Sequence, residues 1–290
     1  MSDDVVIRPL TPEDVPGADR VGWASLQSSV PADMMPDETV RVGRGRARVA
    51  HLQRTDPGGC WVAEAGGEVI GVALSLIRDG VWGFSLFGID PDHQGKGIGT
   101  RLFAPALAYG DGTRGGIILS STHPAAMRRY ARAGFALHPC VAASGIADRR
   151  FLPSGLRSRP ADLGAQADRA TMTAASLHVR GATHDRDLEA LVDTGSQLLV
   201  LDGRGFAGHR DGSVTILAAT DEEAARDLLW SCLAAQPSGA TVGLDFMSAQ
   251  NGWAVDVALE TRLALTPDGP VFVRGQVGPM APFLPSGAYL

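Results

Sequence analysis

Cysteine is scarce in this 290-residue chain. Cys60, Cys140 and Cys232 are far apart and odd in number, so the sequence indicates neither a disulfide framework nor a CxxC metal site. The seven histidines form no HxxxH or HExxH pair, and we therefore expect no bound metal. No apolar run approaches the length of a membrane span, and the N-terminus lacks the basic and apolar regions of a signal peptide. These absences favour a cytoplasmic protein with reduced thiols and no membrane partner.

Positive charge is also in short supply. The chain has 26 Lys and Arg against 32 Asp and Glu, which gives a net charge of -6. This balance argues against a nucleic-acid partner, because phosphates require a basic footprint. With 44% hydrophobic and 20% charged residues, the composition is that of a globular chain with one large domain or two of ordinary size. It leaves open whether the protein is a monomer or a homodimer.

The first half of the chain alternates between strand and helix signals. Two-residue turns at Gly66-Gly67 and Asp79-Gly80 separate three strands and predict an antiparallel meander. Apolar spacing predicts helices on both sides of this meander. The expected strands cover 5–10, 60–65, 69–77, 81–89 and 116–120, and the expected helices begin at Thr11, cover 40–53, follow Ile98 and run from Pro124 to Gly134. A loop is expected at 30–36. The pattern predicts an α/β fold with a mixed, mostly antiparallel sheet.

The second half repeats this pattern in weaker form. Residues 240–265 match the strand, polar turn, helix and final apolar step of residues 115–137. Asp202-Gly203 provides a second hairpin turn, and a strand at 214–219 matches the one before the glycine-rich segment. We therefore predict two tandem copies of one fold. The expected domains are 1–145 and 178–290, with a linker and helix over 146–177.

A glycine-rich loop carries the clearest chemical signal. The strand over 84–89 leads into Gln94-Gly95-Lys96-Gly97-Ile98-Gly99. Glycines at alternate positions let backbone N–H groups turn inward, and the dipole of the following helix adds positive potential. A diphosphate fits such a site. A Walker A loop requires Ser or Thr after Gly-Lys, and a dinucleotide fingerprint requires GxGxxG in a βαβ unit, so spacing and context exclude both.

Two motifs resemble those of a known family. The run from Ile89 to Leu102 resembles the V-x-P-x-x-[RQ]-x-x-G-x-[GA]-x-x-L signature of the GCN5-related N-acetyltransferases (GNAT). The run from His123 to Phe135 resembles the family's second motif, in which a tyrosine-bearing helix ends at Gly-Phe. The similarity covers residues 5–142 and, as a degenerate second copy, 178–275. This arrangement resembles the tandem acetyltransferases of high-GC bacteria, and implies two GNAT-like domains whose sheets are flanked by helices.

The resemblance also implies a reaction and its residues. Acetyl-CoA would be the acyl-donor substrate, and a small-molecule or peptide amine would attack its thioester directly, without an acyl-enzyme. The strand end at 87–89 would bond the pantetheine amides, the loop would hold the pyrophosphate, and Tyr130 would protonate the leaving thiolate. His123 stands where relatives often carry an asparagine that contacts the cofactor. The implied cofactor contacts are Phe87, Gly88, Ile89, Gln94, Gly95, Lys96, Gly97, Ile98, Gly99, Thr100 and His123.

The general base and the acceptor site are not defined by these motifs. Relatives often place a glutamate on the fourth strand, but residues 84–89 contain none. This leaves Glu64, Asp90, a water chain, or an acceptor amine that enters already neutral. Met34 and Met35 stand where relatives shape the acceptor pocket. An equal interpretation is that these two side chains only fill space in the core or at the surface. A run of arginines without acids consists of Arg41, Arg44, Arg46, Arg48 and Arg54. Gly43 and Gly45 argue against a rigid helix face there, and a solvated surface is favoured over a site for an acidic acceptor.

The second copy lacks the features that define the first. Asp221, Glu222 and Glu223 replace the glycine loop, and acids would repel a pyrophosphate. Ala258 stands at the position of Tyr130. We therefore expect no CoA binding there and a structural role. The sequence predicts an N-acetyltransferase, and the alternatives are a CoA- or acyl-CoA-binding sensor without turnover and a structural tandem scaffold.

Overall fold

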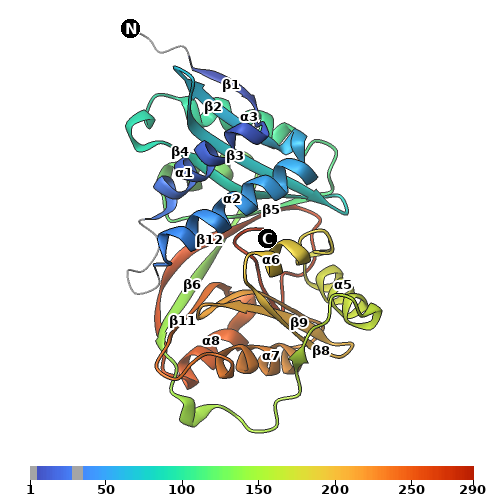
Figure 1. Ribbon diagram of the computed structural model, residues 1–290. Coiled ribbons are helices and arrows are strands. Elements are labelled where there is room, and N and C mark those ends of the chain that lie inside the picture. Colours follow the sequence, from blue (N-terminus) through green and yellow to red (C-terminus); the bar gives the residue numbers. More distant parts are fainter. Residues whose placement is uncertain (1–4, 28–34) are drawn as a thin grey trace. The chain divides into compact units, whose positions relative to one another are not determined.

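The computed structural model describes residues 5–27 and 35–290 (Figure 1). Met34 and most of the loop predicted at 30–36 lie outside the described residues. The chain divides into two compact units, residues 1–118 with Leu290 (unit 1) and residues 119–289 (unit 2). The predicted domain boundaries at 145 and 177 stay predictions. None of the helices among the described residues combines the length and the apolar character that a membrane span requires.

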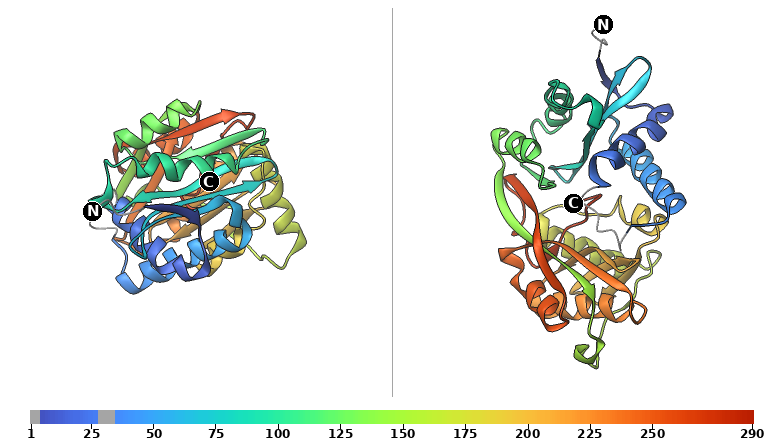
Figure 2. Two further views of the ribbon diagram at one scale, coloured as in Figure 1. Left: turned by 90° about the horizontal axis from the view of Figure 1, so that it is seen from above. Right: turned by 90° about the vertical axis from the view of Figure 1, so that its left-hand side faces the viewer.

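Unit 1 contains the predicted meander and its helices. Its strands lie in the order β1-β2-β3-β4-β5, all neighbours antiparallel except β4 and β5, which are parallel. Figure 2 shows α1 and α2 on one side of this sheet and α3 on the other. The strands are β1 (Val6–Pro9), β2 (Cys60–Ala65), β3 (Glu68–Arg78), β4 (Val81–Ile89) and β5 (Gly115–Leu119), and the helices are α1 (Val15–Leu26), α2 (Glu38–Thr55) and α3 (Ile98–Ala108).

Local chemistry explains why these elements begin and end where they do. Gly66 and Gly67 have φ of 59° and 85°, and Asp79 and Gly80 have φ of 46° and 75°. Two successive left-handed residues define the type I′ turn, whose twist matches that of a hairpin. Thr11 starts the first helical turn through a capping interaction with Asp14. The predicted meander and the first helix start are confirmed.

The interpretation of the arginine run is wrong for its first member. Helix α2 passes through both glycines, and the Arg41 side chain is buried, 3.3 Å from Asp19 and above the ring of Trp23. The reason is a close helix–helix approach: a Cβ on Gly45 would lie 1.8 Å from the Asp19 carboxylate. Gly45 therefore makes room for a buried ion pair instead of breaking the helix.

Unit 2 repeats the element order of the first half. From β7 to β12 the chain runs strand, two helices, three strands, helix, strand, helix and strand, as it does from β1 to β6. The strands of unit 2 lie in the order β12-β6-β11-β10-β9-β8-β7, and β13 pairs with β10. All described pairs are antiparallel except β10 with β11. The predicted α/β fold, with mostly antiparallel sheets flanked by helices, is confirmed.

The bounds in unit 2 show what the sequence pattern missed. The predicted linker contains the short strand β7, and neither β7 nor α6 was expected. Figure 1 shows α7 and α8 below the sheet of unit 2 and α5 above it. The strands are β6 (Ala136–Ile146), β7 (Arg159–Pro160), β8 (Gln197–Leu201), β9 (Gly205–Arg210), β10 (Ser213–Ala219), β11 (Thr241–Ser248), β12 (Ala264–Gly275) and β13 (Phe283–Leu284). The helices are α4 (Pro124–Arg132), α5 (Gln166–Arg180), α6 (Leu188–Asp193), α7 (Glu222–Ala234) and α8 (Gly252–Glu260).

Strand β6 makes pairings that its sequence does not indicate. It follows the elements of the first half in order, yet it pairs with β11 on one edge and with β12 on the other. Each pairing extends over several residues and contains an irregularity, between Leu244 and Met247 on β11 and between Asp268 and Val271 on β12. The central strands of unit 2 therefore come from both halves of the chain.

Candidate functional site

The glycine loop leads from β4 into α3. Gly95 and Gly97 have φ of 76° and 79°, which is the left-handed region that favours glycine. A Cβ at either position would meet no heavy atom within 4 Å, so the loop faces open space. Gly97 is the N-cap of α3 and offers no side chain to satisfy the first N–H groups of the helix. The loop therefore exposes main chain at the positive end of a helix.

These backbone N–H groups form a consecutive set of donors. Among the described residues, no acceptor takes a hydrogen bond from the N–H of residues 95–99, whereas the next N–H, that of Thr100, donates to Gly97 O at 3.1 Å. The Lys96 ammonium donates to Asp92 O at 3.0 Å, and the Gln94 amide donates to Ile89 O at 3.0 Å. The side chains thus brace the loop while its main chain remains available to an anion.

The end of β4 has an open edge beside this loop. The parallel pairing with β5 runs from Val81 opposite Gly115 to Phe84 opposite Ile118 and stops there. Phe87, Gly88 and Ile89 continue to pair with β3 on the other edge. In the part of the chain that the structure describes, no strand pairs with residues 85–89 on the side that faces away from β3. Unit 1 therefore brings the predicted pantetheine strand and the predicted pyrophosphate loop together.

Tyr130 lies on α4 and His123 immediately precedes this helix, both in unit 2. Tyr130 is only 4% exposed, and its ring meets that of Phe272 edge-on, with centroids 5.5 Å apart. Burial raises the pKa of the Tyr130 phenol well above its usual range, so the group is protonated at physiological pH. His123 is the exposed N-cap residue of α4 and makes no side-chain capping bond. Gly134, with φ of 84°, ends this segment as the motif predicts.

The two carboxylates considered as general bases are both engaged. Glu64 lies 2.6 Å from the guanidinium of Arg8. Asp90 accepts a hydrogen bond from the N–H of Asp92 at 3.1 Å and lies 3.6 Å from Arg20. Neither side chain can accept a proton from a substrate without losing a favourable partner.

Asp245 on β11 is a third candidate for the general base, which the sequence did not single out. It lies near a second carboxyl group, that of Asp268 on β12. Asp268 accepts hydrogen bonds from the N–H of Phe246 at 2.7 Å and of Gly269 at 2.6 Å. Asp245 is exposed at the surface of β11, yet the surrounding protein and the nearby Asp268 raise its pKa to about 6. No side-chain partner holds Asp245 among the described residues. Gly269 packs against Ser120 O, just before α4. No spacing rule could reveal this, because the three segments are far apart in the chain.

The corresponding region of the second copy is closed by its own residues. Asp221 caps α7 by accepting from the N–H of Ala224 at 3.0 Å, and Arg204 pairs with Asp221 at 2.5 Å. Strand β10 pairs with β11 only where Ser213 lies opposite Gly243. Farther along, β13 pairs with β10 at Leu217 and Ala218. The strand edge that is open on β4 is therefore covered on β10, and the helix start is already capped.

Comparison with known proteins gives the family of the first half and the fold of the whole. Residues 27–135 match the model of the acetyltransferase (GNAT) family. No curated protein sequence matches the chain. A putative acetyltransferase from Pyrococcus horikoshii has a similar structure, with a TM-score of 0.78 and 15% identity over 100% of this chain and 97% of that one.

Two further solved structures are similar along most of the chain. For a GCN5-related N-acetyltransferase from Sphaerobacter thermophilus the TM-score is 0.57, at 13% identity over 96% of each chain. For one from Kribbella flavida it is 0.58, at 16% identity over 94% of this chain and 72% of that chain. At such identities the likeness is one of fold. The family match and the shared fold agree, and the chain thus contains a GNAT acetyltransferase domain, recognised in residues 27–135.

Proposed function

We propose that the protein transfers an acetyl group from acetyl-CoA to an amine, either a small molecule or a peptide. The observation that carries the proposal is that the N–H groups of residues 95–99 donate to no acceptor among residues 5–27 and 35–290, and that this segment leads from the open edge of β4 into α3. A cradle for a diphosphate next to a free strand edge suits the two ends of the CoA arm, its pyrophosphate and its pantetheine amides. The family match of the same segment supports this assignment.

In the proposed reaction the amine nitrogen attacks the thioester carbonyl carbon. The carbon–sulfur bond then breaks, the acetyl group remains on nitrogen as an amide, and CoA leaves as a thiolate that takes up one proton. An N–H group at the end of β4 would polarise the carbonyl as charge develops on its oxygen. No covalent intermediate with the protein is required.

Tyr130 is proposed to stabilise the leaving thiolate. A thiol has a pKa of roughly 8.5, and burial raises the pKa of Tyr130 above that of an ordinary phenol. Complete transfer of the phenolic proton to sulfur is therefore unfavourable, whereas a hydrogen bond from the neutral hydroxyl to the thiolate is favourable. We expect Tyr130 to act mainly as this hydrogen-bond donor, with the proton released by the amine balancing the charge.

Asp245 is the proposed acceptor of that amine proton. Unlike Glu64 and Asp90, it is not held by an arginine, and a carboxyl group with a pKa of about 6 is charged yet basic at neutral pH. Its neighbour Asp268 is fixed by two backbone N–H groups next to Ser120. This arrangement would hold the base near the segment that leads to His123 and Tyr130.

The test combines binding and turnover. Release of free thiol from acetyl-CoA is measured across a panel of amines, with wild type beside Tyr130→Phe and with Tyr109→Phe as a matched loss of one hydroxyl elsewhere. We expect Tyr130→Phe to lower kcat by about tenfold or more with little change in acetyl-CoA affinity, and Tyr109→Phe to leave kcat near the wild-type value. Binding without turnover on any amine would favour a sensor. Failure of acetyl-CoA to raise the melting temperature would favour a scaffold.

A further inference from the structure

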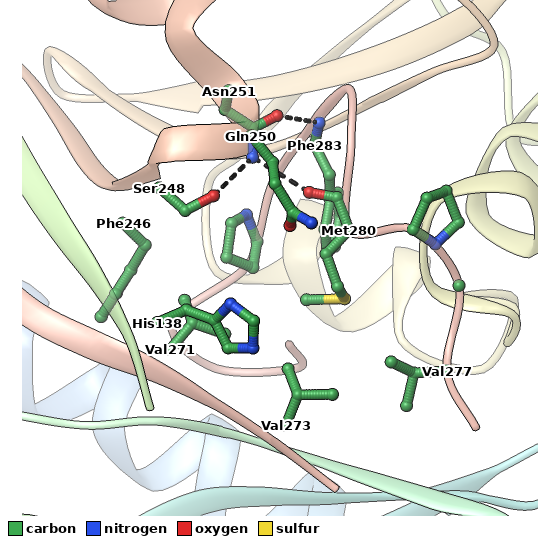
Figure 3. A pocket seen from close by; sticks show the side chains of 13 residues that line it. His138, Phe246, Ser248, Gln250, Asn251, Val271, Val273, Val277, Met280 and Phe283 are labelled. Carbon is green, nitrogen blue, oxygen red and sulfur yellow. Dashed lines mark hydrogen bonds between the residues drawn. The ribbon is translucent and has the colours of Figure 1, made fainter. Parts of the chain in front are cut away.

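Unit 2 contains a pocket of about 150 Å³ whose lining residues all belong to this unit (Figure 3). It lies between β6, β11, β12, residues 250–251 and the segment 277–285 that follows β12. Figure 3 shows His138, Val273, Val277 and Met280 around a common space. Most of the wall is apolar, and this part consists of Phe246, Val271, Val273, Val277, Met280 and Phe283.

The pocket and Tyr130 lie on opposite faces of β12. Side chains alternate between the two faces of a strand. Phe272 meets the Tyr130 ring on one face, whereas Val271 and Val273 line the pocket on the other. A molecule in the pocket would therefore not contact Tyr130, and the pocket has no part in the proposed stabilisation of the thiolate.

Two residues of the pocket wall have a backbone conformation that favours glycine. Phe246 and Met280 both have φ of 56°. A bulky side chain in this conformation raises the free energy of the folded chain, and such residues are concentrated at binding and active sites, where surrounding contacts hold them in place. In the part of the chain that the structure describes, the other non-glycine residues with positive φ lie in hairpin turns, after a helix or at the final residue: Asp79, Asp211, Arg262 and Leu290. These local settings account for the others but not for the two residues at the pocket.

Hydrogen bonds hold the two strained residues in place. Phe246 lies in the bulge of β11, where a strand changes the direction of its side chains, and its N–H donates to the Asp268 carboxylate at 2.7 Å. The N–H of Met280 donates to Val179 O at 2.7 Å, and its carbonyl oxygen accepts from the Asn251 amide at 3.0 Å. Asn251 is buried and makes its further bonds to Ser248, Trp253 and Phe283. Because these bonds are made within the protein, the pocket is formed before any ligand arrives.

Two polar side chains at the pocket remain available to a ligand. Neither the His138 ring nor the Gln250 amide makes a side-chain hydrogen bond to any residue that the structure describes. His138 is half-buried and Gln250 is exposed, so both lie where the pocket meets the solvent. A neutral imidazole and an amide each contain a donor and an acceptor, as a hydroxyl group does. The pocket therefore combines an apolar interior with a polar rim that suits a hydroxyl.

We propose that unit 2 binds a small uncharged molecule in this pocket, with an apolar group of about the size of a benzene ring and one hydroxyl group. An apolar cavity of about 150 Å³ holds a benzene molecule, so larger ring systems are excluded by volume. The hydroxyl bonds His138, and the apolar group contacts Phe246 and Met280. The inference goes beyond the proposed function and does not depend on it, because every residue that it uses lies in unit 2.

The experiment measures the binding of phenol and of benzene to the full chain by ligand-observed NMR, without acetyl-CoA. The wild type binds phenol saturably and about three- to tenfold more tightly than benzene, which corresponds to one hydrogen bond. A hydroxyl without a partner would reverse this order, because its transfer from water is unfavourable. His138→Phe keeps a ring at this position and removes the preference for phenol.

Filling the pocket tests where phenol binds. Val273→Trp abolishes the binding of phenol and of benzene. Val277→Trp, in the segment after β12, gives the same result where Val273→Trp fails to fold. Val192→Trp, at a position that is 41% exposed on α6 of the same unit, is the control and keeps both affinities at the wild-type values.

The outcomes distinguish the site from its ligand class. Absence of saturable phenol binding to the wild type overturns the site, and so does binding that Val273→Trp and Val277→Trp leave unchanged. Tighter binding of benzene than of phenol overturns the hydroxyl contact to His138. Thiol release from acetyl-CoA is measured separately, so that a failure of the proposed acetyl transfer is recognised as such and leaves this site intact.

Discussion

The substitution Gly97→Ala tests whether the glycine loop holds the pyrophosphate. Gly97 has φ of 79°, and a Cβ there would meet no heavy atom within 4 Å. Alanine therefore causes no clash, and its effect is limited to the backbone, where the left-handed conformation costs about 1–2 kcal/mol. The free loop can escape this cost by rotating to a negative φ, which turns its N–H groups away from the site.

The binding of acetyl-CoA must then restore the strained conformation. The cost of about 1–2 kcal/mol appears in the dissociation constant and corresponds to binding that is about 5- to 30-fold weaker. Adding Gly95→Ala, at a φ of 76° and also without neighbours, should weaken binding further by a similar factor. Isothermal titration calorimetry with acetyl-CoA measures both effects.

A matched control separates a local effect from a global one. Gly67 has φ of 85°, is equally free of neighbours and lies in the β2–β3 turn. Gly67→Ala introduces the same type of strain and should lower the free energy of unfolding by about 1 kcal/mol without altering acetyl-CoA affinity. Acetyl-CoA affinity within twofold of wild type in Gly97→Ala would refute the assignment of the loop. Equal weakening by Gly67→Ala would show that the effect is not specific to the loop.

Three further substitutions test other parts of the molecule. Asp245→Asn should remove the rise in kcat/KM that wild type shows as the pH increases through about 6, because only the deprotonated carboxyl accepts a proton. The pKa of Asp245 is higher in the folded chain, at about 6, than its ordinary value of 3.8. The free energy of unfolding of the wild type therefore decreases as the pH rises from 3.8 to about 6, and the variant should lack this decrease when urea unfolding is measured at several pH values. Asp221→Ala removes the N-cap of α7 and should lower the free energy of unfolding by about 1 kcal/mol, while calorimetry should still give one acetyl-CoA per chain; two sites would contradict the assignment of the second copy. Gly45→Ala displaces Asp19 and should cost about 3 kcal/mol in urea unfolding, whereas Gly43→Ala, with no neighbour within 4 Å, should stabilise α2 by about 0.5–1 kcal/mol; equal effects of the two alanines would contradict the packing argument.

The sequence by itself determined the features that depend on neighbouring residues. The turns at Gly66-Gly67 and Asp79-Gly80 were predicted because type I′ geometry requires left-handed residues at two adjacent positions. The glycine loop was predicted because alternating glycines before an apolar helix are a local arrangement of backbone donors. The helix that ends at Gly134 was visible for the same reason. In each case the physical cause acts within a few residues, so spacing is sufficient to reveal it.

Only the tertiary structure decided the features that depend on contacts between distant segments. Strand β6 pairs with β11 and β12, and β13 covers the edge of β10, because backbone pairing across long loops has no sequence period. Glycine disfavours helices in general, but Gly45 lies inside α2 because the buried Asp19–Arg41 pair leaves no room for a side chain there. Asp245 is likewise placed near Asp268 by two strands, β11 and β12, that meet in space. Local chemistry therefore identified the donor loop, whereas the environment of the proposed base exists only through long-range packing.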